Sequence, residues 1–170
     1  MSVIYTIGYE STDIDRFVMT LKTAGIERVA DVRAVTLSRK KGFSKKALAA
    51  RLEAEEIQYL HFIELGDPRP GREAARAGRY QEFRDIYEAH LDSADAQASL
   101  RKLLTTVREA TTCLLCFERD PENCHRSIVA EQLKESGFEV FDLYSDYPEI
   151  NVRSNPRRPR YHPRQGTAAA

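Results

Sequence analysis

The chain has 170 residues, of which 42% are hydrophobic and 31% charged, and its 26 lysines and arginines balance 26 aspartates and glutamates. This length suits about one domain with a buried core, and the composition is typical of soluble proteins rather than of wholly disordered ones. A membrane, collagenous or disulfide-scaffold protein is excluded, because no apolar run approaches the roughly 20 residues of a membrane-spanning helix and cysteines are few.

The balanced charge hides an uneven distribution along the chain. Residues 151–170 hold five arginines and no acidic residue, which leaves residues 1–150 with a net charge of −5. We predict one domain over residues 1–150 and a basic, flexible tail over 151–170 that adds nothing to the core. A basic tail can also serve as an arm that binds nucleic acid or another anion.

The expected location of the protein follows from its cysteines and its first residues. Three cysteines, an odd number, argue against a disulfide framework and suit a reducing compartment. The first residues lack the basic region and apolar stretch of a secretory signal. We therefore expect a cytoplasmic protein that contacts no membrane.

Five short runs rich in apolar, β-branched or aromatic residues predict strands, and several are apolar almost throughout, which suits strands covered on both faces. The runs are Val3–Gly8, Arg28–Arg33, Ile57–Phe62, Thr112–Phe117 and Glu139–Tyr144. Helical periodicity lies between them, at Thr12–Ala24, Ser44–Glu55, Tyr80–His90, Ala96–Ala110 and Asn123–Glu135.

Strands and helices alternate along most of the chain. This alternation predicts a single three-layer α/β domain, with a mostly parallel sheet of about five strands flanked by helices. The first, second and fourth runs are the most continuously apolar, so we place them at the centre of the sheet. Ser44 and Asn123 are the expected N-caps of their helices, and Gly25 and Gly137 the expected stops.

Two stretches interrupt the alternation. Residues 34–43 are predicted to form a basic loop, and residues 64–79 a loop rich in glycine, proline and arginine. Long connections in a compact domain often bind ligands or cover a site.

Polar residues gather where the first four predicted strands end. In an open parallel sheet, ligands bind outside the carboxyl ends of the strands. We therefore predict a pocket at this edge, with Asp31, Glu118 and Cys124 as catalytic candidates. The candidates for substrate binding are Gly8, Tyr9, Ser11, Arg33, Ser38, His125 and Arg126.

The segment from Cys116 to Arg126 is the most informative, because a buried strand leads through a turn at Pro121 into a helix. The free amides at the start of a helix favour an anion and lower the pKa of a cysteine placed there. Cys124 could then act as a nucleophile and Glu118 as a general acid or base. Alternatively, the segment is a structural turn that His125 and Arg126 fix by pairing with acidic residues.

Cys116, Cys124 and His125 are possible ligands of a zinc ion. However, the turn has no close Cys-x-x-Cys pair, and Cys113 and Cys116 should point to opposite faces of their strand. The prediction is therefore no metal and no cofactor.

Two further groups of charged residues have open interpretations. Alternation along the strand places Asp31 and Arg33 on one face, where they form an ion pair or bind a polar ligand together. Around Phe43 lies a basic segment that could contact phosphates and stack a base, or could be a solvated loop. Its basic residues are Arg39, Lys40, Lys41, Lys45 and Lys46.

Three elements of the sequence resemble the domain-of-unknown-function 488 (DUF488) family. They are Thr6-Ile7-Gly8, Asp31-Val32-Arg33 and Cys116-x-Glu118-x-x-Pro121-x-x-Cys124-His125-Arg126, and Leu65-Gly66 matches part of a fourth. The resemblance spans about residues 3–146 and implies a compact α/β domain of bacterial type.

The sequence departs from that family pattern at three places. Tyr9-Glu10 stands in place of the residues that usually follow Thr-Ile-Gly, Asp67 stands in place of a glycine, and Ala34-Val35-Thr36 lacks a proline. We expect these positions to line the pocket and to influence the choice of substrate.

The leading hypothesis is an enzyme that acts on a small phosphorylated or nucleotide-like substrate, or on nucleic acid. Arg33 and Arg126 would bind the anion together with the helix amides, and Glu118 or Asp31 would transfer protons. The alternative is a non-catalytic nucleic-acid-binding or adaptor domain that uses residues 39–46 and the arginine-rich tail. A third possibility is a structural or regulatory domain.

Overall fold

The computed structural model of this protein describes residues 2–146. The tail predicted over residues 151–170 lies outside the described residues and stays a prediction. No helix within residues 2–146 combines the length and the apolar character that crossing a membrane requires.

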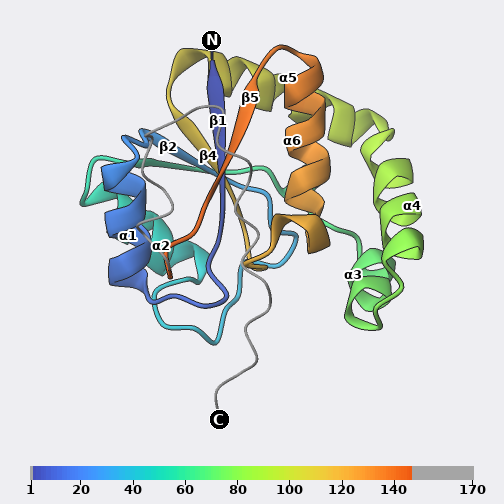
Figure 1. Cartoon of the computed structure of the whole chain (residues 1–170), viewed down its shortest axis with the longest axis horizontal. Helices are drawn as coiled ribbons and strands as arrows, with labels where there is room; N and C mark the ends of the chain where they lie inside the picture. Colours follow the sequence, from blue (N-terminus) through green and yellow to red (C-terminus); the bar gives the residue numbers. More distant parts are fainter. Residues whose placement is uncertain (1, 147–170) are drawn as a thin grey trace.

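A five-stranded sheet, parallel throughout, forms the centre of the structure (Figure 1). Its spatial order is β3-β2-β4-β1-β5, which confirms that the first, second and fourth predicted strands are central. The strands are β1 (Val3–Gly8), β2 (Arg28–Asp31), β3 (Gln58–His61), β4 (Thr112–Cys116) and β5 (Glu139–Leu143).

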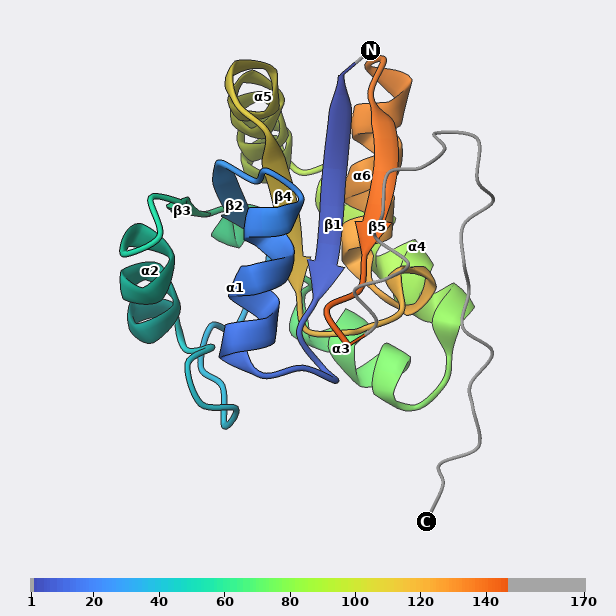
Figure 2. The same cartoon turned by 60° about the vertical axis from the view of Figure 1, so that its left-hand side comes forward.

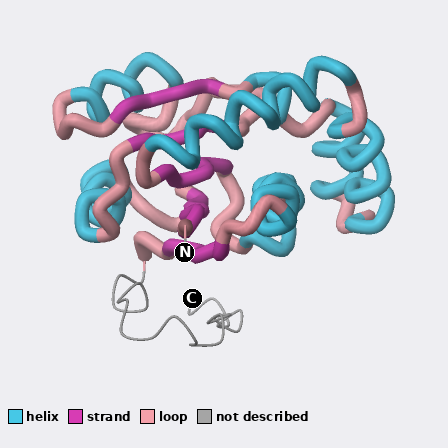
Figure 3. The backbone as a smooth tube through the Cα atoms, turned by 90° about the horizontal axis from the view of Figure 1, so that it is seen from above, coloured by secondary structure: helices cyan, strands magenta, loops and turns pink. Residues whose placement is uncertain are grey.

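Helices cover both faces of the sheet, so the predicted three-layer α/β architecture is confirmed (Figure 3). One face carries α1 and α2, and the other carries α5 and α6 with α3 and α4 packed outside them. The helices are α1 (Ile14–Thr23), α2 (Lys45–Glu53), α3 (Arg69–Arg76), α4 (Tyr80–Leu91), α5 (Ala94–Glu109) and α6 (His125–Glu135). Two short 3-10 turns span Ile63–Leu65 and Pro121–Asn123.

Each face of the sheet has its own hydrophobic core, because side chains alternate between the faces along a strand. Ile4 of β1 and Leu114 of β4 pack with α4, α5 and α6, whereas Tyr5 and Cys113 pack with α1 and α2. The central strands are therefore apolar on both faces, which explains their nearly continuous apolar runs.

Two local predictions were wrong. Residues 64–79 are not one loop, because α3 forms within them; Pro70 occupies the first turn of α3, where a proline costs no intrahelical hydrogen bond. Asn123 does not cap α6, because it belongs to a 3-10 turn and Cys124 is the N-cap. The predicted stops Gly25 and Gly137 both have positive φ, as a glycine at a helix end allows.

The connections create a crevice between β1 and β4. The chain leaves β1 through α1 toward β2, and leaves the neighbouring β4 through α6 toward β5, on the opposite face. Figure 2 shows β1 and β5 pointing to the same edge of the sheet. Adjacent strands whose connections diverge leave a ligand-binding crevice at their carboxyl ends.

Candidate functional site

A cavity of about 1190 Å³ opens at this carboxyl edge of the sheet. Its walls come from the segments after β1, β2 and β4 and from α3. Of the residues singled out in the sequence, the lining includes Tyr9, Arg33, Ser38, Arg39, Glu118, Cys124 and His125. It also includes four arginines that were not among the predicted site residues: Arg69, Arg72, Arg76 and Arg119.

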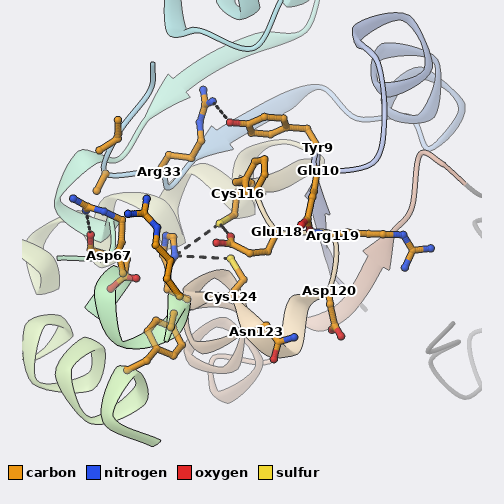
Figure 4. Close-up of a pocket in the computed structure, with 18 of the residues that line it drawn as sticks. Tyr9, Glu10, Arg33, Asp67, Cys116, Glu118, Arg119, Asp120, Asn123 and Cys124 are labelled. Carbon is orange, nitrogen blue, oxygen red and sulfur yellow. Dashed lines mark hydrogen bonds between the residues drawn. The ribbon is translucent and has the colours of Figure 1, made fainter. Parts of the chain in front are cut away.

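Two thiols, an imidazole and a carboxyl group meet at one side of this cavity. Figure 4 shows Cys116, Glu118 and Cys124 converging. The Cys116 thiol lies 2.8 Å from Glu118 Oε2, and His125 Nδ1 lies 3.8 Å from the Sγ atoms of both Cys116 and Cys124. We call Cys116, Glu118, Cys124 and His125 the cysteine–histidine cluster.

Three members of this cluster are held by a strand end or a helix start, and Glu118 lies in the loop after β4. Cys116 is the last residue of β4, and Cys124 is the N-cap of α6, where its Sγ accepts from the backbone amide of Arg126 at 3.5 Å. His125 Nε2 lies 2.6 Å from the Val32 carbonyl oxygen, and the Tyr87 ring packs 5.2 Å from the imidazole.

Burial and mutual contact change the acidity of the cluster. Burial, reinforced by Cys116, raises the pKa of Glu118 to about 8. Burial and the neighbouring Cys124 raise the pKa of the Cys116 thiol to about 12. Burial opposes the charge of His125, but Cys116 and the Val32 carbonyl outweigh it and raise the ring pKa to about 9.

Three arginines of the cavity wall form no ion pair within residues 2–146: Arg39, Arg72 and Arg76. Arg72 donates to the backbone carbonyl of Asp67, and its charge favours the Asp67 carboxylate. The other arginines of the wall are paired, Arg33 with Asp31, Arg69 with Glu73 and Arg119 with Asp146. Two acidic residues of the wall, Glu10 and Asp120, accept from backbone amides. Glu10 Oε2 accepts from the amide of Arg119 at 3.0 Å.

Exposed apolar side chains border the same cavity. Val35, Leu37, Tyr80 and Phe117 all line it and are all largely exposed, Leu37 by 83%. Exposed apolar groups gathered at a cavity are a common feature of ligand-binding surfaces.

Asp67, which was expected to line the pocket, is a buried carboxyl group. It is 6% exposed, it lines the cavity, and its Oδ1 accepts no hydrogen bond from the described residues. Burial raises its pKa to about 6, although His125, Arg72 and His90 favour the charged form. The expectation rested on the departure from the family pattern, where a carboxylate replaces a glycine.

Asp31 and Arg33 form the ion pair that was one of their two interpretations. Arg33 Nε and Nη2 donate to the Asp31 carboxylate at 2.9 and 2.7 Å, and Nη1 donates to Tyr9 Oη and Phe43 O. Asp31 is fully buried, also accepts from Tyr59 Oη, and is not part of the cavity lining. This pair therefore braces the wall.

Arg126, Gly8 and Ser11 also lie outside the cavity lining. The guanidinium of Arg126 is fully buried and donates to Thr6 Oγ1 and to the carbonyl oxygens of Glu118 and Arg119. A Cβ on Gly8 would lie 1.7 Å from the Glu118 carbonyl oxygen, so the backbones of β1 and the loop after β4 are in close approach. Ser11 is exposed.

The basic segment is only partly free. Lys40 Nζ donates to the carbonyl oxygens of Tyr9 and Glu10 at 2.9 and 2.6 Å, and Lys45 Nζ lies 3.3 Å from His61 Nδ1. Lys41 and Lys46 are exposed. Two of the five basic residues thus hold the segment in place.

A family model described as "Domain of unknown function DUF488" matches residues 13–133. No curated protein and no solved structure matches the chain. The positions at which the sequence departs from the pattern of that family, among them Tyr9, Glu10, Ala34, Val35 and Asp67, do line the cavity.

Proposed function

The chain belongs to the DUF488 family, and we propose that it is an enzyme that acts on a small phosphorylated, nucleotide-like substrate in the cavity at the carboxyl edge of its sheet. One observation carries the proposal: within the described residues, three arginines that form no ion pair, exposed apolar side chains and the cysteine–histidine cluster share one cavity. The free thiols suit a reducing cytoplasm, where we expect the enzyme to act.

The arginines support an anionic substrate. Arg72 and Arg76 are four residues apart on α3, which places them on one helix face, and Arg39 lines the cavity from the segment after β2. A planar guanidinium group presents paired donors that match the oxygens of a phosphate group.

The exposed apolar side chains support a base beside the phosphate. Phe117 follows β4 directly, and Tyr80 begins α4; both line the cavity. An aromatic ring next to arginines is an arrangement that stacks a nucleobase while the phosphate is held, whatever the base.

The cysteine–histidine cluster supports catalysis rather than binding alone. A thiol, an imidazole and a carboxyl group within hydrogen-bonding or near-contact distance provide groups that transfer protons or attack a substrate. A pure binding surface needs no such cluster. The reaction centre of the proposed enzyme is therefore this end of the cavity.

The test combines binding with turnover. Purified protein is titrated by calorimetry with adenosine and guanosine mono-, di- and triphosphates and with a short single-stranded oligonucleotide. We expect at least one nucleotide to bind, and the Arg72→Gln/Arg76→Gln variant to bind it at least about tenfold more weakly. The matched control, Arg101→Gln/Arg108→Gln, changes two exposed arginines of α5 and should bind as the wild type does.

Turnover is then followed by mass spectrometry of the incubated nucleotide. His125→Gln should lose turnover while retaining affinity. Absence of binding to every ligand would overturn the proposal. Binding without turnover in the wild type would contradict the enzyme and favour the nucleic-acid-binding alternative, whose affinity falls steeply with salt concentration.

A further inference from the structure

We infer that Cys116, Cys124 and His125 form a binding site for a zinc-like divalent cation that opens onto the cavity. This inference goes beyond the proposed function and does not rest on it. Within residues 2–146, the two Sγ atoms and a ring nitrogen of His125 all lie within 4.8 Å of one another, and all three residues are buried.

The distances suit tetrahedral coordination. Zinc bonds of about 2.3 Å to sulfur and about 2.0 Å to nitrogen place neighbouring donor atoms roughly 3.5 Å apart in a tetrahedron. His125 Nδ1 lies 3.8 Å from each of the two sulfur atoms. Shortening each of the two nitrogen–sulfur distances by roughly a few tenths of an ångström would therefore let all three atoms bond to one ion.

The imidazole is oriented as a ligand. A carbonyl oxygen can only accept a hydrogen bond, so the 2.6 Å contact between His125 Nε2 and Val32 O places a hydrogen on Nε2. Nδ1 is then the nitrogen that faces the two sulfur atoms. A metal-bound histidine almost always donates its other ring N–H to a carboxylate, a backbone carbonyl or water in this way.

The thiols are positioned by rigid elements rather than by a turn. Cys116 ends β4 and Cys124 caps α6, so the fold brings together two sulfur atoms from cysteines with seven residues between them. The amide of Arg126 donates to Cys124 Sγ, a contact that stabilises a thiolate ligand. Sequence spacing disfavoured a metal here because the turn itself holds no Cys-x-x-Cys pair and Cys113 and Cys116 were expected on opposite faces of their strand. In the structure, the end of β4 and the start of α6 bring Cys116 and Cys124 together instead.

Three protein donors leave one coordination position for the cavity. All three residues line the cavity, and the Glu118 carboxyl group lies 2.8 Å from Cys116 Sγ. Zinc sites that take part in catalysis have three protein ligands and one open position, whereas structural sites have four. Thiolate and imidazole donors select zinc over magnesium or calcium, which prefer oxygen ligands.

Binding is balanced by release of protons. The ion bonds to two thiolates and to the Nδ1 lone pair, so each thiol releases one proton to solvent, and a protonated ring releases one more. No electron is transferred, and no bond other than those to hydrogen is broken.

The first experiment uses the metal alone. Protein is stripped with EDTA in the presence of a non-thiol reductant, freed of chelator and titrated with Co²⁺. We expect one equivalent to give thiolate-to-cobalt charge-transfer absorption with the visible bands of tetrahedral Co²⁺, and Zn²⁺ to displace it. Cys116→Ser and Cys124→Ser should lose these bands, whereas Cys113→Ser, which changes the third cysteine in the other core, should keep them.

A second experiment needs no variant and so does not depend on how a variant folds. The wild-type protein is alkylated with and without Zn²⁺, and the modified cysteines are identified by mass spectrometry. Zinc should slow alkylation of Cys116 and Cys124 at least about tenfold and leave Cys113 unchanged. Absence of cobalt absorption, its loss in Cys113→Ser alone, or equal protection of all three cysteines would overturn the inference.

The two proposals fail separately. A protein that binds nucleotide but no cobalt would overturn the metal site and leave the proposed function standing. A protein that binds cobalt at these residues but no nucleotide would do the reverse.

Discussion

Arg126 has the largest side chain among the fully buried residues, and it connects β1 to the loop after β4. Its guanidinium group is surrounded by acceptors: the Thr6 hydroxyl and the carbonyl oxygens of Glu118 and Arg119. A buried cation of this kind persists because its donors are satisfied. Arg126 therefore holds Glu118 at the cavity.

We predict that Arg126→Ala lowers the free energy of unfolding by about 3 kcal/mol or more, because buried carbonyl oxygens lose their donor and a cavity opens. The measurement is urea denaturation at neutral pH. The control is Arg101→Ala on the exposed side of α5, which should change the free energy of unfolding by less than about 0.5 kcal/mol. Equal effects of the two variants would contradict the bracing role of Arg126.

The raised pKa of Asp67 predicts that the stability of the protein depends on pH. Its pKa is about 6 in the folded protein against 3.8 for an ordinary aspartate, so the folded state binds a proton more tightly than the unfolded state. The stability contributed by this group therefore falls as pH rises from about 4 to about 6, and the loss is complete above that range. The groups that face it, His125, Arg72 and His90, limit the loss because they favour the carboxylate.

The variant Asp67→Asn should remove this penalty. In metal-free protein we expect it to raise the free energy of unfolding at pH 7.5 by up to about 3 kcal/mol, with the difference vanishing below about pH 4. Denaturation curves at several pH values test this expectation. The exposed Asp92, changed to Asn, should show no such trend. A gain for Asp67→Asn that is constant with pH would show that ionisation of the buried carboxyl group is not its cause.

Sequence reasoning located some site residues and not others for a physical reason. Strand ends and a helix start define an edge, so Glu118, Cys124 and His125 could be placed at the cavity from the sequence. Some polar side chains are buried because they bond to residues that are distant in sequence. Arg126, for example, donates to the hydroxyl of Thr6. The Asp31 carboxylate likewise accepts hydrogen bonds from its neighbour Arg33 and from Tyr59 of the next strand, which the sequence alone does not show.

At the scale of elements, the position of the cluster depends on how closely β1 approaches the loop after β4. The Gly8 backbone leaves no space for a Cβ, because the Glu118 carbonyl carbon and oxygen would lie 2.4 and 1.7 Å from it. Both atoms belong to the backbone, so a clash can be relieved only by moving the loop. The glycine thus sets the distance between two strand ends.

Gly8→Ala should cost more than about 3 kcal/mol of stability and shift the amide resonances of residues 116–119 in NMR spectra. The comparison variant is Gly25→Ala, where φ is +71° but no atom lies within 4 Å of the added Cβ. Gly25→Ala should lower the free energy of unfolding by only about 1 kcal/mol, because its sole cost is the strain of an alanine in a left-handed backbone conformation. A smaller loss for Gly8→Ala than for Gly25→Ala would show that the loop moves freely.

Elements were predicted best where packing follows local periodicity. The five strands and the helices α1, α2, α4, α5 and α6 were each recognised from their apolar spacing. The short α3 was missed because its sequence is mostly arginine, alanine and glutamate after a proline and exposes most of its surface. Its arginines at positions 69, 72 and 76 nevertheless repeat at helical spacing, which is the signal that could have found it.

At the scale of the whole molecule, the sheet order explains why one cavity gathers groups from distant parts of the chain. β1 and β4 are neighbours in space, yet about 100 residues separate them in sequence, and their connections diverge to opposite faces. The parallel arrangement was predictable from alternation of strands and helices. The strand order was not, because long-range pairing leaves no local pattern.

The composition of residues 151–170, which lie outside the described structure, predicts that they contribute little to stability. They hold five arginines and only two large apolar residues, Val152 and Tyr161, so few buried contacts would be lost on deletion. We expect deletion to change the melting temperature by no more than about two degrees. A larger drop in a calorimetric scan would show that the tail docks on the domain.

The central claim is that nucleotide-like anions bind in the cavity beside Cys124, and protection from alkylation tests it most directly. Cys124 lines the cavity and Cys113 is buried in the core on the opposite face, although their exposed fractions are only 2% and 0%. In EDTA, iodoacetamide should modify Cys124 faster than Cys113, and a saturating nucleotide should slow Cys124 at least about tenfold without affecting Cys113. Equal rates at the two cysteines, or a rate at Cys124 that no nucleotide changes, would contradict the account.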